Sequence, residues 1–205
     1  MYHDSLENFS IASASKDPVP GGGGVSGAVG ALAASLAQMV TNLTIGKKYY
    51  ASYENELKEI KEKSERLRCE LLESINEDAK AFKPLADIYS LDRSTPDYDT
   101  LMEEALRNAA LSPYNIMTLC RDVIELDERL AVIGSKIAVS DAATSVMLAH
   151  GALYGAFINV RVNTRLMKDK EYAAKMEEDA RAMLNEYSER ALSCYKAVEK
   201  RLADG

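Results

Sequence analysis

The chain has 205 residues, of which 47% are hydrophobic and 28% charged, and its formal net charge is -7. This length suits one domain, expected over residues 1–205, and the apolar content excludes the disordered and low-complexity classes. The acidic balance argues against a nucleic-acid partner, because nucleic-acid binders usually concentrate Lys and Arg on one face.

The three cysteines, Cys69, Cys120 and Cys194, lie far apart and form no CxxC pair. Neither a disulfide framework nor a zinc site is indicated. Because the first residues also lack the basic-then-apolar order of a signal peptide, we expect a reducing, cytoplasmic location.

Taken in chain order, nearly every segment predicts a helix. A small-residue helix follows the glycines at 21–24, and apolar residues in steps of three and four predict one long helix over 47–89. Pro84 falls inside that helix and is expected to kink it.

The second half of the chain continues the pattern. Residues 94–97 predict a loop, followed by a short helix over 98–111 and another that begins at Ser112-Pro113 and ends at Gly134. A helix over 136–167 and a final helix capped by Asp169 complete the chain. The expected fold is therefore all-α, a multi-helix up-and-down bundle.

Two stretches, 18–46 and 142–160, are almost free of charge and near the length of about 20 residues that crosses a bilayer. The first consists largely of small and polar residues, and the chain as a whole is rich in charge. This composition favours central helices of a bundle over a membrane hairpin, so no membrane partner is expected.

Chemistry is indicated first by Gly21-Gly22-Gly23-Gly24. Such a run exposes backbone N–H groups at a helix start, where they can hold an anion, or else it forms a tight turn that permits close packing. Either reading fits these residues equally well.

Asp78 lies in phase with the apolar stripe of its helix and should face inward. It is either an inter-helix salt bridge or cap, or a carboxylate that transfers protons or binds a ligand. On the later helix, one face carries residues in steps of three and four: Asp141, Ser145, Leu148, Ala152, Ala156, Asn159 and Asn163.

Other polar residues are less informative. His150 lies off that polar face and is interpreted as a core histidine, and no metal-ligand spacing occurs, so no metal site is expected. For Lys47, Lys48, Arg161 and Arg165, favourable contact with a helix end or a solvated surface is favoured over anion binding.

Several of these residues together form a recognisable set of motifs. They are Pro18 to Gly23, Asn42-Leu43-Thr44-Ile45-Gly46-Lys47-Lys48, Asp78-Ala79-x-Ala81-Phe82, Ser140-Asp141-Ala142 and Phe157-Ile158-Asn159-Val160-x-Val162-Asn163. In this order they resemble the cyclodeaminase/cyclohydrolase family, which includes the C-terminal domain of formimidoyltransferase-cyclodeaminase and stand-alone methenyltetrahydrofolate cyclohydrolases.

The resemblance implies a helical homodimer that binds a tetrahydrofolate derivative as substrate and holds no tightly bound cofactor. It implies hydrolysis of 5,10-methenyltetrahydrofolate to 10-formyltetrahydrofolate, or cyclisation of 5-formimidoyltetrahydrofolate with release of ammonia. A separately encoded formimidoyltransferase could supply the second substrate. The sequence does not choose between these activities.

The resemblance also assigns candidate roles. The catalytic candidates are Asp78, Asp141 and Lys47, with either Asp as the general acid and base. The substrate-binding candidates are Gly21, Gly22, Gly23, Gly24, Ser26, Asn42, Thr44, Lys48, Asn159, Asn163 and Arg165. Among them, the three asparagines would bond the pterin edge, and the basic residues would meet the glutamate carboxylates.

One departure concerns Gly24, because relatives often have Ser there. The competing hypothesis is a non-catalytic protein, which binds folate or uses its small-residue helices only for assembly. Two inward-facing Asp residues are costly for a purely structural bundle and favour an enzyme.

Overall fold

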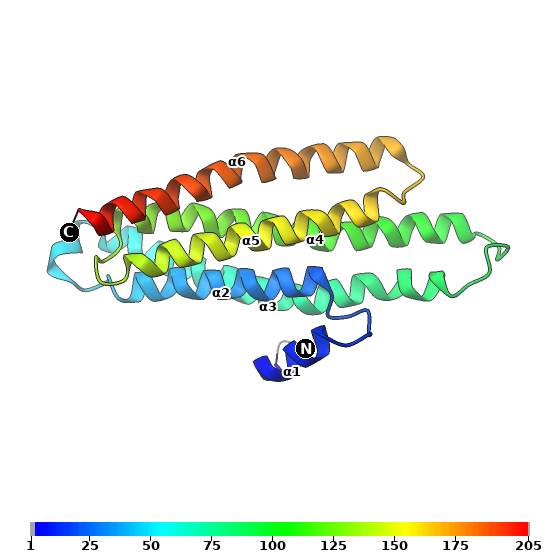
Figure 1. Cartoon of the computed structure of the whole chain (residues 1–205), viewed down its shortest axis with the longest axis horizontal. Helices are drawn as coiled ribbons and strands as arrows, with labels where there is room; N and C mark the ends of the chain where they lie inside the picture. The colour runs from blue at the N-terminus through cyan, green and yellow to red at the C-terminus, as the bar shows by residue number, and fades with distance from the viewer. Residues whose placement is uncertain (1–2, 205) are drawn as a thin grey trace.

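The computed structural model describes residues 3–204, and it is built from helices alone within that range. Its α-helices are α1 (Leu6–Ser13), α2 (Gly22–Asn42), α3 (Glu54–Tyr89), α4 (Tyr98–Ile133), α5 (Val139–Thr164) and α6 (Lys170–Ala203), with a 3-10 helix η1 (Lys48–Tyr53) before α3. The predicted all-α bundle is confirmed (Figure 1).

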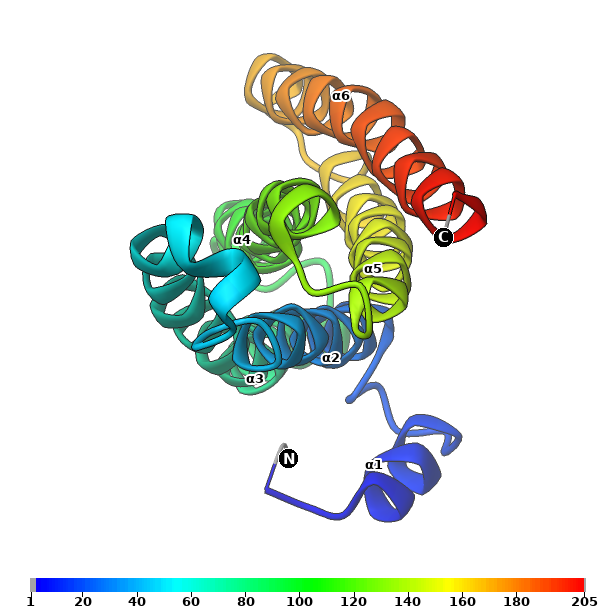
Figure 2. The same ribbon diagram turned by 90° about the vertical axis from the view of Figure 1, so that its left-hand side faces the viewer.

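Four helices, α2 to α5, form the body of the bundle, and α6 packs along α5 and α4. Seen along the bundle, α1 stands away from this body on the side of α2 (Figure 2). None of the residues of α1 is buried. The core therefore lies among α2 to α6, and α1 is an addition to its surface.

Small residues let α2 approach its neighbours closely. A Cβ on Gly27 would lie 2.6 Å from Ser74 Oγ of α3, and one on Gly30 would lie 3.0 Å from Cys120 Sγ of α4. On the other side, a Cβ on Gly155 of α5 would lie 2.5 Å from Ser26 Oγ. By length and composition alone, α2 and α5 could cross a membrane, but in the fold they are packed central helices.

The predicted break at Ser112-Pro113 is wrong, because α4 runs unbroken from Tyr98 to Ile133. Proline lacks the N–H that would bond the carbonyl four residues earlier, which belongs to Ala109. Asn163 of α5 replaces that bond, because its Nδ2 donates to the Ala109 carbonyl at 3.0 Å. A side chain from another helix thus satisfies the backbone group that Pro113 leaves free.

Other boundaries differ at the ends. The helix predicted over 47–89 begins only at Glu54, because residues 48–53 form η1, and it continues through Pro84. The helix predicted over 136–167 is shorter, Val139–Thr164, and α1 was not predicted. The Asp169 cap is confirmed, since its side chain accepts a hydrogen bond from the Tyr172 N–H at 3.0 Å.

A carboxyl group that the sequence interpretation missed lies at the centre of the bundle. Asp127 is 0% exposed, and its Oδ1 has no hydrogen-bond partner among the described residues. Ser145 Oγ lies 2.7 Å from Asp127 Oδ2 and 2.8 Å from the Ala33 carbonyl oxygen. Because a hydroxyl group has one proton, Ser145 can donate to only one of these two oxygens. Both contacts are satisfied when Asp127 is protonated and donates to Ser145, and Ser145 donates to Ala33.

Burial also raises the pKa of Asp127 well above its usual range, against the opposing hydrogen bond from Ser145. A carboxyl group whose pKa is raised by folding stabilises the fold below its unfolded-state pKa. That contribution disappears as the pH rises toward the folded-state pKa. Asp127 should therefore make the protein less stable as the solution becomes less acidic.

We predict that Asp127→Asn removes this loss, because an amide can donate to Ser145 without a proton to lose. The free energy of unfolding of the variant, minus that of the unmodified protein, should increase by about 1 kcal/mol or more as the pH rises from 4 toward 8. The increase should stop once the pH passes the folded-state pKa of Asp127. Urea unfolding at several pH values measures it. Asp122→Asn on the same helix is the control, and an equal pH trend in both variants would contradict the prediction.

Candidate active site

A cavity of about 190 Å³ lies where α2 begins. Beyond that point α3, α4 and α5 continue without α2 (Figure 1), and the segment before Gly21 contributes Pro18 and Val19 to the cavity. The lining residues come from all of these elements: Pro18, Val19, Gly21, Gly22, Gly23, Asp78, Phe82, Ala109, Pro113, Asn159, Val162 and Asn163.

Asp78 is the titratable group of this cavity. Its Oδ1 accepts a hydrogen bond from the Ser112 hydroxyl at 3.2 Å, and its carboxylate also accepts one from the Gly24 backbone N–H. Burial raises the pKa of Asp78 above its ordinary value, while these two hydrogen bonds lower it. The net shift of the pKa is upward, the direction expected for a carboxyl group that exchanges protons in catalysis.

Gly22 and Gly23 are required by close contacts across the cavity. A Cβ on Gly23 would lie 2.4 Å from Asp78 Oδ1, and one on Gly22 would lie 2.8 Å from Asn159 Nδ2. The glycines therefore let both side chains reach the N-terminus of α2. The structure thus shows the close packing that one interpretation of the glycine run predicts, and the Gly24 N–H at the same helix start already bonds the Asp78 carboxylate.

Gly24 differs from its two neighbours. A Cβ there would lie 3.4 Å from Pro20 Cβ, 3.7 Å from Ile75 Cγ2 and 4.0 Å from Asp78 Oδ2, which are ordinary contacts. A serine would fit and could bring its hydroxyl to Asp78. The packing thus tolerates either residue, and Gly24 already supplies its backbone N–H to the carboxylate.

Asn159 and Asn163 line the cavity from the last turns of α5. Asn159 Nδ2 donates to the Gly155 carbonyl at 2.7 Å, and Asn163 Nδ2 donates to the Asn159 and Ala109 carbonyls at 3.0 Å. These bonds fix both amide groups and leave their Oδ1 atoms as acceptors for a ligand.

Five of the other candidates lie at the opposite end of α2, about 30 Å away along the helix axis. There Lys47 Nζ donates to Ser135 Oγ at 2.8 Å, and Thr44 Oγ1 accepts from the Ser135 N–H at 2.8 Å. These two residues join the chain after α2 to the loop before α5. Asn42 and Lys48 are exposed nearby, and Asp141 lies in the first turn of α5.

The remaining predicted residues lie near the cavity without lining it. The Ser26 hydroxyl is buried and donates to the Gly22 carbonyl at 2.7 Å, while Arg165 is exposed at the end of α5. His150 lies off the polar face, as predicted, and contacts the Tyr154 ring edge to face. Within one chain, the structure thus brings together the four glycines 21–24, Asp78, Asn159 and Asn163.

Ser112, Pro113 and Phe82 are site residues to which the sequence interpretation gave no role. Ser112 and Pro113 were read as a helix start, so their position opposite Asp78 was not foreseen. Phe82 belongs to the motif Asp78-Ala79-x-Ala81-Phe82, but the sequence interpretation assigned it no contact with a substrate. Among residues 3–204, no group of three or more His, Cys, Asp or Glu side chains could hold a metal ion.

Comparison with known proteins gives relatives over nearly the whole chain. A methenyltetrahydrofolate cyclohydrolase of Methylorubrum extorquens is 35% identical over 98% of both chains. The formimidoyltransferase-cyclodeaminase of Mus musculus is 25% identical over 96% of this chain, which spans 37% of that longer protein.

A solved structure is also similar. The formiminotetrahydrofolate cyclodeaminase of Thermotoga maritima superposes with a TM-score of 0.84 at 30% identity, and the match covers 98% of this chain and 96% of that one. The sequence model of the formiminotransferase-cyclodeaminase family matches residues 5–182. With that match and the fold in agreement, the chain belongs to the formiminotransferase-cyclodeaminase family.

Proposed function

We propose that the protein is a tetrahydrofolate one-carbon enzyme acting at the N5/N10 bridge. It hydrolyses 5,10-methenyltetrahydrofolate to 10-formyltetrahydrofolate, cyclises 5-formimidoyltetrahydrofolate to the methenyl form with release of ammonia, or does both. The observation that carries this proposal is the half-buried Asp78, with its raised pKa, beside two fixed amides and the N-terminus of α2.

In the hydrolysis, Asp78 removes a proton from the water that attacks the methenyl carbon. The resulting tetrahedral carbon carries a hydroxyl group and releases N5, which receives the proton held by Asp78. The hydroxyl proton passes to solvent as the C=O bond forms, and the formyl group stays on N10. In the cyclisation, N10 attacks the formimidoyl carbon, Asp78 takes the proton of N10, and ammonia leaves after protonation. One carboxyl group that first accepts and then donates a proton therefore serves both reactions.

Asn159 and Asn163 would bind the pterin edge, whose amide and amine groups need fixed partners. The glycine N–H groups would lie near the reacting carbon, where positive helix-end charge favours an anion. The free thiols of Cys69, Cys120 and Cys194 support the further proposal of a reducing, cytoplasmic location.

Turnover measurements with both folate substrates test the proposed function. Loss of methenyltetrahydrofolate absorbance faster than the uncatalysed rate identifies a cyclohydrolase. Appearance of that absorbance from 5-formimidoyltetrahydrofolate, together with release of ammonia, identifies a cyclodeaminase. If neither rate exceeds the uncatalysed one, the proposal is overturned, and folate binding without turnover then favours the non-catalytic alternative.

Asp78→Asn should lower kcat at least about a hundredfold, because an amide cannot accept the proton in the first step. Circular dichroism should show unchanged helix content. Asp87→Asn, on the same helix outside the cavity, is the control and should keep kcat. Near-normal turnover by the Asp78 variant would remove Asp78 from the mechanism.

We also propose that two copies associate through the outer face of α2. This face carries six apolar residues in alternating steps of four and three, none of them fully buried: Val25, Val29, Leu32, Leu36, Met39 and Leu43. A charge-free stripe of this kind is typical of a helix that packs on a partner helix. A second copy is the natural partner, since one stripe matches another in a two-fold interface.

A two-fold axis perpendicular to α2 would make the paired α2 helices antiparallel. The end of one chain that carries Lys47, Lys48 and Asp141 would then lie beside the glycine end of the other. The candidates that one chain keeps about 30 Å apart could meet in such a dimer. In this arrangement, Lys47 and Asp141 of one copy would approach the Asp78 cavity of the other copy.

Met39→Glu should disrupt the dimer, because it places a charge within the apolar stripe at a residue that is 47% exposed in one chain. Light scattering should show a shift from dimer mass toward monomer mass. Leu192→Glu on α6, at a residue 43% exposed, is the matched control and should stay dimeric. Equal masses for both variants would contradict association through α2.

A further inference from the structure

The cavity at Asp78 is small for the proposed substrate. Its volume of about 190 Å³ is below the roughly 300 Å³ at which pockets begin to enclose a drug-sized ligand. A tetrahydrofolate carries a p-aminobenzoyl ring and a glutamate in addition to its bicyclic pterin. If the proposed function holds, the part of the substrate beyond the pterin must lie outside this cavity.

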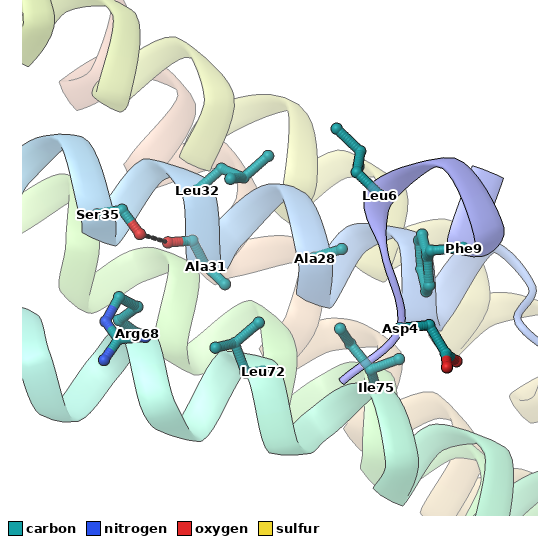
Figure 3. A pocket seen from close by; sticks show the side chains of 10 residues that line it. All are labelled: Asp4, Leu6, Phe9, Ala28, Ala31, Leu32, Ser35, Arg68, Leu72 and Ile75. Atoms are coloured by element: carbon teal, nitrogen blue, oxygen red, sulfur yellow. Dashed lines mark hydrogen bonds between the residues drawn. The ribbon is translucent and has the colours of Figure 1, made fainter. Parts of the chain in front are cut away.

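A second cavity, of about 260 Å³, lies between α1 and the groove formed by α2 and α3 (Figure 3). Its floor is mainly apolar and its outer wall comes from α1 and the residues just before it. The lining residues are Asp4, Leu6, Phe9, Ala28, Ala31, Leu32, Ser35, Arg68, Leu72 and Ile75. An apolar hollow of this kind suits a flat aromatic ring.

The two cavities lie close to each other along α2 and α3, although no residue lines both. Ile75 lines the second cavity and lies one turn before Asp78 on α3. A Cβ on Gly24 would touch Ile75 Cγ2 at 3.7 Å and lie 4.0 Å from Asp78 Oδ2, so Gly24 adjoins both residues. The two volumes together fall within the range that encloses a whole ligand of this size.

Arg68 supplies a positive charge at the far end of the second cavity (Figure 3). It precedes Asp78 on α3 by about 15 Å of helix rise. Glu65 accepts from its Nε at 3.1 Å and its Nη2 at 2.5 Å, and Nη1 donates to none of the described residues. A guanidinium group with a free edge can bind a carboxylate.

We propose that the cavity beneath α1 is the subsite for the p-aminobenzoyl-glutamate part of the folate. The ring packs on Leu72 and Ile75, and Arg68 binds a glutamate carboxylate. The pterin and the one-carbon unit stay at Asp78. On this proposal α1, although it buries none of its own residues, forms one wall of the substrate site.

Binding of N-(4-aminobenzoyl)-L-glutamate to the full chain, measured by calorimetry, tests the subsite without requiring turnover. Arg68→Gln should weaken binding at least about tenfold, because it removes a charged hydrogen-bond donor. Arg66→Gln is the matched control, since Arg66 lies on the same helix, pairs with Glu70 at 3.4 Å and does not line the cavity. Equal affinities for the two variants, or no binding to the unmodified chain, would overturn the proposal.

Ala28→Phe gives a second, independent readout because it fills the cavity rather than changing its charge. It should abolish binding of the fragment while the thermal unfolding temperature confirms that the chain is folded. In turnover, Arg68→Gln should raise KM and leave kcat unchanged. If the fragment binds but neither folate substrate is turned over, the proposed enzymatic function is refuted and the subsite is supported. If the protein turns over folate with the same KM before and after Arg68→Gln, only the subsite is refuted.

Discussion

The site depends on the close approach of α3 and α5 to the first turn of α2. That approach is possible only because Gly22 and Gly23 have no side chains, since a Cβ on either would lie within 2.8 Å of the Asn159 amide or the Asp78 carboxylate. The same shortage of side-chain volume continues along α2, where Gly27 and Gly30 admit α3 and α4. One sequence feature therefore sets both the packing of the bundle and the contents of its cavity.

This contact places Asp78 between opposing influences. Burial favours its neutral form, whereas the Gly24 N–H, the Ser112 hydroxyl and the positive end of α2 favour its charged form. A carboxyl group in such a balance can change its protonation state during a reaction at little energetic cost. Asp127 shows the contrast, because it lies in the core without a cationic partner, and burial raises its pKa well above the usual range against the opposing hydrogen bond from Ser145.

Much of this arrangement could be predicted from the sequence. The helical spacing placed Asp78 on an inward face, the polar face of α5 grouped Asn159 with Asn163, and the charge-free stretches indicated central helices. Each of these inferences needs only the period of a helix.

Other features depend on contacts between helices that no local pattern reveals. The continuity of α4 through Pro113 requires the Asn163 amide from α5, and the separation of Lys47 from Asp78 follows from the direction in which α2 runs. Asp127 could have been found, since it follows Val123 by four residues and precedes Leu130 by three within the apolar stripe of its helix.

The most direct test of the account is the titration of Asp78 itself. Carbon-13 NMR of the side-chain carboxyl carbons, compared between the unmodified chain and Asp78→Asn, identifies its signal and its midpoint. The account predicts a pKa above the ordinary Asp value of about 3.9, because burial outweighs the two hydrogen bonds. A midpoint at or below that value would contradict the account, because Asp78 would then be a fixed charge rather than a group that exchanges protons.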